Sequence, residues 1–155
     1  MTDLISELTT ALGLAAGSRA AALDRLWSAL PADDHAGRCI VAHYAADQQA
    51  SVDDEIAWDE LALAESAQLT DDALAAIQPG LTVESFLPSL YLNVADGYRR
   101  ARRFDQAAAQ LELGRAHLGA FDDAPPEQSG YIEMIRGGYA RAADLIDRRS
   151  SATAE

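Results

Sequence analysis

Apolar residues recur every three or four positions through nearly the whole chain, which is the spacing of amphipathic helices. Glycine, proline and polar clusters divide the pattern into about seven helices, with a further short helix at 71–77. The main helices are expected at about 4–12, 18–30 and 36–49, from Ser51 to about 65, in a stretch ending near 101, and at 104–118 and 131–148. The pattern therefore predicts an all-α protein made of antiparallel helical hairpins.

Two of the expected helices begin at residues that are good N-caps. Ser51 is followed three residues later by Asp54, a carboxylate variant of the capping box, and the acids at 53–55 suit the positive end of the helix dipole. Ser18 is expected to cap the second helix, and Pro31 to end it. The acidic run at 53–55 therefore has a structural explanation.

The composition agrees with a helical domain of ordinary size. The chain has 155 residues, 49% of them hydrophobic, which is enough to bury a substantial core. Alanine is the commonest residue, and all 12 basic residues are arginine. We expect residues 1–149 to form a single domain and residues 150–155 to form a disordered tail.

The formal net charge is −13, and the negative charge is unevenly spread. Residues 1–98 contain 16 acids and three arginines, whereas residues 99–155 contain nine of each. A field of this sign repels phosphate backbones and anionic lipids, despite the four arginines between Arg99 and Arg103. We therefore expect binding neither to nucleic acid nor to membranes.

The single cysteine and the N-terminal segment bear on the compartment. Because Cys39 is alone, no disulfide can form within the chain, which fits a reducing environment. The N-terminal segment has acids where a signal peptide has basic residues, and no apolar run is long enough to cross a bilayer. The sequence therefore predicts a cytoplasmic protein.

Residues 91–114, YLNVADGYRRARRFDQAAAQLELG, combine aromatic and small residues at a characteristic spacing. The positions concerned are Tyr91, Asn93, Val94, Ala95, Tyr98, Phe104, Ala107, Leu111 and Gly114. This spacing resembles the tetratricopeptide repeat (TPR), a helix–turn–helix unit of 34 residues in which small residues let two helices approach closely. The resemblance covers residues 88–119 and departs from the family at Arg102, which replaces the turn glycine, and at Gly119, where a proline is common.

A degenerate copy of the same pattern covers residues 38–68. Ala45, Ala57 and Ala64 have the mutual spacing of the small residues in the clearer repeat, but the aromatic positions are polar. The resemblance implies a short TPR-like solenoid, with an N-terminal hairpin at one end and a C-terminal capping helix from Tyr131 at the other.

Proteins that resemble this family mostly bind peptides or protein partners along the first helix of each hairpin, and most are not enzymes. The resemblance therefore implies a non-catalytic interaction or scaffold module without a cofactor. The candidate partner-binding residues are Asn93, Asp96, Arg99, Arg100, His43 and Asp47.

The arginines of the hairpin and the ends of the stack raise two further questions. Arg102 and Arg103 fall at the hairpin turn, near the negative end of a helix dipole. Arg99 and Arg100 could form ion pairs either with carboxylates of this chain or with those of a partner.

A homodimer is a further candidate, because a short stack leaves apolar ends that a second copy could cover.

Other functions have weaker support in the sequence. His43 and Asp47 share a helix face, but a metal site needs three or four ligands and no HExxH or CxxC motif supplies the others. Cys39 and His43 are also four residues apart, yet they have no third group to orient them, so Cys39 is expected to pack in the core. The alternative function is a regulatory or ligand-binding protein, or an enzyme accessory subunit, with a pocket that uses His43, Asp47, Trp58 and Tyr98.

Overall fold

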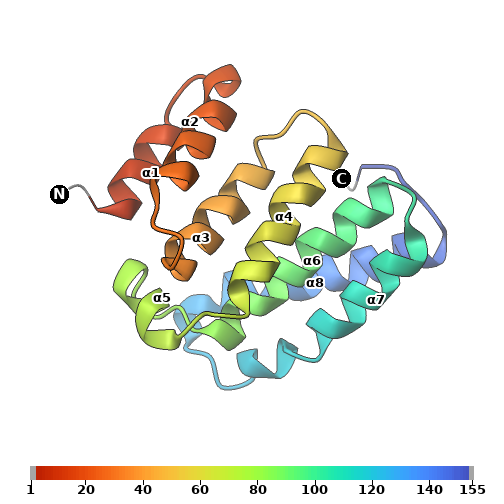
Figure 1. Ribbon diagram of the computed structural model, residues 1–155. Helices are drawn as coiled ribbons and strands as arrows, with labels where there is room; N and C mark the ends of the chain where they lie inside the picture. Colours follow the sequence, from red (N-terminus) through yellow and green to blue (C-terminus); the bar gives the residue numbers. More distant parts are fainter. Residues whose placement is uncertain (1–2, 154–155) are drawn as a thin grey trace. The chain divides into compact units, whose positions relative to one another are not determined.

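The computed structural model describes residues 3–153, which form α-helices and 3-10 helices and contain no strand (Figure 1). This architecture confirms the predicted all-α class. The chain divides after Val83 into two compact units, here called unit 1 (Met1–Val83) and unit 2 (Glu84–Glu155). No helix within residues 3–153 is long and apolar enough to span a membrane.

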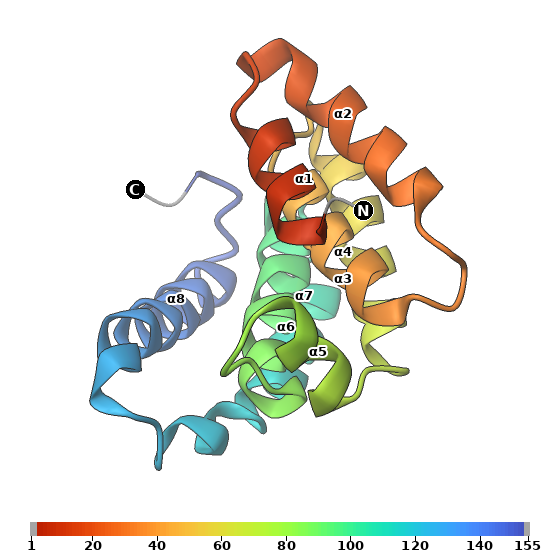
Figure 2. The ribbon, with the colours of Figure 1, turned by 90° about the vertical axis from the view of Figure 1, so that its left-hand side faces the viewer.

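Unit 1 is built around its third helix. Its elements are α1 (Leu4–Leu12), α2 (Ala16–Ala29), α3 (His35–Ala46), α4 (Val52–Ser66) and α5 (Asp71–Ile77). Helix α3 packs against α2, α4 and α5, and α1 packs against α2 (Figure 2). Because α3 buries mainly small residues, α4 comes close enough for the thiol of Cys39 to donate a hydrogen bond to the carbonyl of Ala62 at 3.2 Å.

The helix starts in unit 1 bear out one predicted cap and contradict the other. The hydroxyl of Ser51 accepts a hydrogen bond from the backbone N–H of Asp54 at 3.1 Å, as the capping pattern predicts. The Ser18 prediction is wrong, because α2 begins two residues earlier. The N–H of Ser18 already donates to the carbonyl of Ala15 at 2.8 Å, so the first turn closes through the backbone without a side-chain cap.

The face that α4 turns to the core differs from the one that the degenerate repeat predicts. Ala45 of α3 is buried as expected, but Ala57 and Ala64 of α4 are exposed. The residues of α4 that are buried instead are Ile56, Asp59, Ala62 and Ser66. Turning this face to the core removes the large side chain of Ile56 from water. It is therefore more favourable than burying the face that carries Ala57 and Ala64.

Unit 2 consists of a long helical hairpin and a third long helix. Its elements are α6 (Val83–Arg100), α7 (Phe104–Arg115), the short 3-10 helices η1 (Leu118–Phe121) and η2 (Pro126–Gln128), and α8 (Ser129–Asp147). Helices α6 and α7 run antiparallel (Figure 1). Most of the hairpin residues predicted to pack at the crossing are buried, namely Tyr98, Phe104, Ala107, Leu111 and Gly114, whereas Tyr91 is only partly buried.

The three long helices of unit 2 meet at Gly114. The hydroxyl of Tyr139, on α8, donates a hydrogen bond to the carbonyl of Pro88, on α6, at 2.7 Å. A Cβ atom on Gly114 would collide with this hydroxyl and would lie 2.5 Å from the Cβ of Tyr91. Glycine is therefore the residue that lets α7 approach both neighbours.

The turn between α6 and α7 has the hydrogen bonds of a Schellman motif. The N–H of Arg103 donates to the carbonyl of Tyr98 at 2.8 Å, and the N–H of Arg102 donates to that of Arg99 at 2.9 Å. Arg102 adopts φ 65°, the left-handed conformation that glycine tolerates best. The TPR-like pattern expected from the sequence has glycine at this position, and Arg102 takes its place in a conformation that costs a non-glycine residue about 1 kcal/mol or more.

Replacing Arg102 with glycine is expected to raise the free energy of unfolding by about 1 kcal/mol, because glycine relieves the strain of the left-handed backbone. Arg103→Gly is the matched control, since Arg103 has φ −95° and its guanidinium lies 4.3 Å from the ring centre of Tyr98. That control should lower the free energy of unfolding. Urea denaturation measures both, and a destabilised Arg102→Gly variant would contradict the turn geometry.

Candidate functional site

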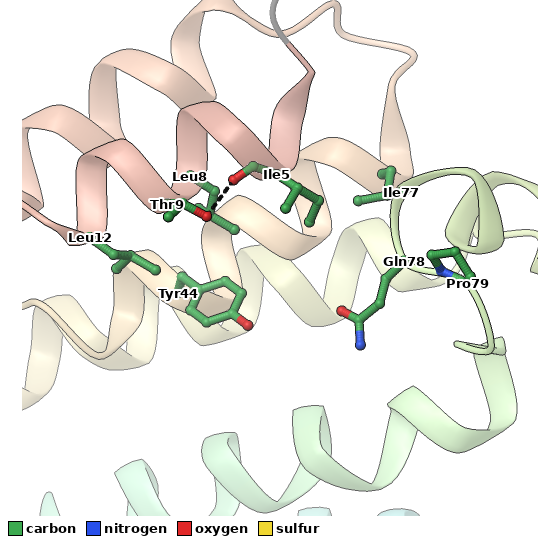
Figure 3. A pocket seen from close by; sticks show the side chains of 8 residues that line it. All are labelled: Ile5, Leu8, Thr9, Leu12, Tyr44, Ile77, Gln78 and Pro79. Carbon is green, nitrogen blue, oxygen red and sulfur yellow. Dashed lines mark hydrogen bonds between the residues drawn. The ribbon is translucent and has the colours of Figure 1, made fainter.

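Unit 1 contains an open pocket of about 390 Å³ whose walls come from three helices (Figure 3). It is lined by Ile5, Leu8, Thr9 and Leu12 of α1, Tyr44 of α3, and Ile77, Gln78 and Pro79 at the end of α5. Helix α1 presents Ile5, Leu8 and Leu12 together because they recur at helical spacing. The volume is within the range of pockets that hold small ligands or single side chains.

The walls of this pocket are mostly apolar. The hydroxyl of Thr9 donates a hydrogen bond to the carbonyl of Ile5 at 2.7 Å, drawn as the dashed line in Figure 3, so it is engaged by the helix itself. Ile5 is 39% exposed and Tyr44 is 36% exposed, which leaves apolar surface open to solvent. The Gln78 amide and the Tyr44 hydroxyl add polar groups. The pocket can therefore hold an apolar side chain and offer hydrogen bonds beside it.

The predicted residues His43 and Asp47 lie on either side of Tyr44 along α3. The rings of His43 and Tyr44 pack edge to face with centroids 5.6 Å apart, and burial lowers the pKa of His43 to about 4, so its imidazole is neutral at pH 7. Asp47 is exposed at the C-cap of α3, one helical turn after Tyr44 and on the same side of the helix. An acidic side chain therefore lies one helical turn beyond the pocket residue Tyr44.

In unit 2, Asn93 and Asp96 line a smaller groove of about 170 Å³ between α6 and α8. The other lining residues are Leu92, Gly138, Arg141, Ala142 and Leu145. The carboxylate of Asp96 accepts hydrogen bonds from Arg99 at 2.8 Å and from Arg100 at 2.9 Å. Two of the predicted residues therefore share a groove, and the charge of Asp96 is largely engaged within the chain.

Arg99 is fully buried, with 0% of its surface exposed. Its guanidinium donates to Asp96 and, through Nη1, to the carbonyls of Ser150 at 2.8 Å and Ala152 at 2.7 Å. Of the two roles that the sequence left open for Arg99, the structure shows pairing with a carboxylate of the same chain. The guanidinium of Arg99 also holds the start of the predicted tail at 150–155 by hydrogen bonds. The last two residues of that tail lie outside the described part of the chain.

The other residues considered from the sequence take part in packing. Trp58 stacks edge to face on Trp27 with centroids 5.6 Å apart in unit 1, while Tyr98 is buried in unit 2. Cys39 is fully buried, and this burial raises the pKa of its thiol to about 12, which agrees with the predicted core role. Within residues 3–153, no three His, Cys, Asp or Glu side chains come together in an arrangement that could hold a metal ion.

A partly buried cluster of charged side chains in unit 1 is centred on Glu65, close to the tryptophan pair. Its carboxylate accepts a hydrogen bond from Arg38 at 3.0 Å and lies 2.7 Å from the ring nitrogen of His35. Although burial alone raises the pKa of Glu65, these two partners lower it below its usual value. The guanidinium of Arg38 also lies 3.7 Å from the ring centre of Trp27, so this cluster fixes α2, α3 and α4 together.

Comparison with known proteins adds no identification: no family model, no curated protein and no solved structure matches this chain. The sites themselves must therefore indicate the function. The pocket of unit 1 described above has a larger volume than the groove of unit 2 and exposes more apolar surface. In the groove, the carboxylate of Asp96 is already paired. Of the two, the unit 1 pocket is the stronger candidate for binding a partner.

Proposed function

We propose that this protein is a non-catalytic interaction module, and that the unit 1 pocket binds an apolar side chain from a peptide segment of a protein partner. The observation that carries the proposal is the open apolar pocket between α1, α3 and α5, with Ile5 and Tyr44 exposed. A mostly apolar pocket with a few polar groups at its edge is the usual form of a binding site.

The charge of unit 1 indicates the chemistry of the partner. Residues 1–83 contain 14 acids and three arginines, and Asp47 follows Tyr44 on the same helix face. A negative field attracts basic segments and repels acidic ones. The proposed partner segment therefore has a large apolar residue flanked by Lys or Arg.

The helical scaffold supports the same proposal. Residues 88–119 resemble a tetratricopeptide repeat, and proteins of that family mostly bind peptides or other proteins. We propose a TPR-like scaffold on this basis, with unit 2 providing the hairpin that carries the resemblance. The burial of Tyr98, Phe104, Ala107, Leu111 and Gly114 is consistent with that pattern.

Selection from a random peptide display library against the full chain should test the proposal. We expect enrichment of peptides with an apolar residue between basic ones, with affinities measurable by fluorescence anisotropy. Ile5→Ser and Tyr44→Ser should each weaken binding by about tenfold, equivalent to about 1.4 kcal/mol, by removing a wall of the pocket.

Leu113→Ser is the matched control, because Leu113 is 52% exposed on α7 of unit 2 and is not one of the pocket-lining residues. This variant should bind the selected peptides as well as the natural chain does. Enrichment of acidic peptides, or equal binding by the pocket variants and the control, would contradict the proposal.

A further inference from the structure

Helix α8 has an exposed face opposite the one that packs in unit 2. The core side of α8 buries Ile135, Tyr139, Ala142 and Ile146. The opposite side carries Glu133, Met134, Gly137, Ala140 and Arg141, all of them exposed, and Arg141 also borders the groove between α6 and α8. Met134 is 63% exposed, so the first half of this helix presents an apolar side chain directly to solvent.

Two charged residues on this face, Glu133 and Arg141, are placed symmetrically about Gly137, whereas Asp144 and Arg148 lie further along the same face and pair with each other at 3.1 Å. Glu133 lies four residues before it and Arg141 four residues after it, so each is about 6 Å from Gly137 along the helix axis. Neither Glu133 nor Arg141 forms an ion pair within residues 3–153, whereas the neighbouring Arg136 pairs with Asp122 at 3.0 Å. The unpaired charges are thus one acid and one base on the same face.

A second copy of α8 running antiparallel would match this arrangement. If the two helices cross at Gly137, Glu133 of each copy lies level with Arg141 of the other copy, and both pairs form by symmetry. Such an interface is self-complementary, as a two-fold dimer requires. With any other crossing point, Glu133 of one copy does not lie level with Arg141 of the other copy.

The packing around Gly137 supports close approach at the crossing. A Cβ atom built on Gly137 would meet nothing within 4 Å, so the packing of the single chain does not require glycine there. Glycine inside a helix lowers helix stability compared with alanine. A second helix backbone close to Gly137 gives a reason for its presence that the single chain lacks.

We propose that the protein forms a homodimer through α8, with two antiparallel copies crossing at Gly137. Glu133 pairs with Arg141 of the second copy, and Met134 packs beside the same crossing. The apolar area is modest, so the charge pairs set the orientation and the association is reversible. This surface is separate from the unit 1 pocket, and its test does not depend on peptide binding.

Charge reversal tests the pairing directly in the full chain. By sedimentation equilibrium, the natural protein should dimerise, and Glu133→Arg or Arg141→Glu should each raise the dissociation constant at least about tenfold by placing like charges together. The double variant E133R/R141E should restore dimerisation. Arg136→Glu, on α8 but off this face, should leave the dissociation constant unchanged.

A cysteine at the crossing supplies a second test. Gly137→Cys should form a disulfide-linked dimer under mild oxidation, because the two Cβ atoms meet at the symmetry axis. Gly130→Cys is matched to it, since a Cβ there also meets nothing within 4 Å, but the antiparallel pairing keeps the two copies of residue 130 apart. Cys39 is fully buried and does not compete.

Several outcomes would overturn the proposal. A protein that remains monomeric up to about 1 mM has no such interface. A double charge reversal that stays as weak as the single variants, or an Arg136→Glu variant equally weakened, would exclude the proposed pairs. Equal cross-linking at residues 130 and 137 would exclude the antiparallel crossing.

Discussion

Replacing Arg99 with methionine should lower the free energy of unfolding by about 2–4 kcal/mol, because the fully buried guanidinium makes hydrogen bonds to a carboxylate and to two carbonyls that methionine cannot make. Methionine keeps most of the apolar volume but none of the hydrogen-bond donors. The carbonyls of Ser150 and Ala152 would lose donors at 2.8 and 2.7 Å, and Asp96 would lose its shortest arginine contact. Urea denaturation followed by circular dichroism measures the change.

The matched control for this variant is Arg148→Met. Arg148 also bonds a carboxylate on its own helix, that of Asp144 at 3.1 Å, but its side chain is 72% exposed. An exposed pair of this kind contributes less than about 1 kcal/mol. If the two variants lose similar amounts of stability, the buried network does not hold unit 2 together.

Limited proteolysis gives a second measurement that separates the tail from the rest of unit 2. Trypsin should cleave after Arg149 faster in the Arg99→Met variant, because residues 150–152 lose the guanidinium that binds their carbonyls. The natural chain and Arg148→Met should be cleaved at similar rates at this position. Unchanged cleavage in Arg99→Met would show that Arg99 does not restrain the tail.

Alanine at Gly114 should lower the free energy of unfolding by about 3 kcal/mol, because the added methyl group overpacks the place where α6, α7 and α8 meet. The new Cβ would collide with the hydroxyl of Tyr139 and lie 2.5 Å from the Cβ of Tyr91. Neither neighbour can move freely, since that hydroxyl is hydrogen-bonded to the carbonyl of Pro88. Urea denaturation again gives the value.

Gly137→Ala provides the control for glycine replacement inside a helix. With nothing within 4 Å of its Cβ, alanine should raise the free energy of unfolding by about 0.5–1 kcal/mol at low protein concentration. Gly114→Ala should cost less in a Tyr139→Phe background, because one of the colliding atoms is gone. A Gly114→Ala variant as stable as the natural chain would contradict the three-helix contact.

Much of the α6–α7 hairpin could be predicted because its determinants are local. Small and aromatic residues at fixed spacing predict which side of each helix packs, and Ala107, Leu111 and Gly114 are buried accordingly. The same spacing failed at Ala57 and Ala64, where the pattern lacks aromatic residues and burial of Ile56 decides the face of α4.

The sites were less accessible to sequence analysis because their parts are far apart in the chain. Tyr44 shares a pocket with Ile5 and Ile77, and nothing local to any of the three indicates the others. Arg99 resembles a solvated helix-end arginine by sequence, since its partners include backbone carbonyls about 50 residues later, which carry no sequence signal. The predicted His43 and Asp47 lie beside Tyr44 in the sequence but do not line the pocket.

The uneven charge of the chain also affects how quickly a partner would arrive. Residues 1–83 carry most of the negative charge, so a basic segment experiences attraction before any contact forms. At about 0.1 M salt this attraction extends about 10 Å into the solvent, and it reaches further as salt is diluted. For the proposed basic partner, the pocket would determine how long an encounter lasts, while the carboxylates of unit 1 would determine how often one begins.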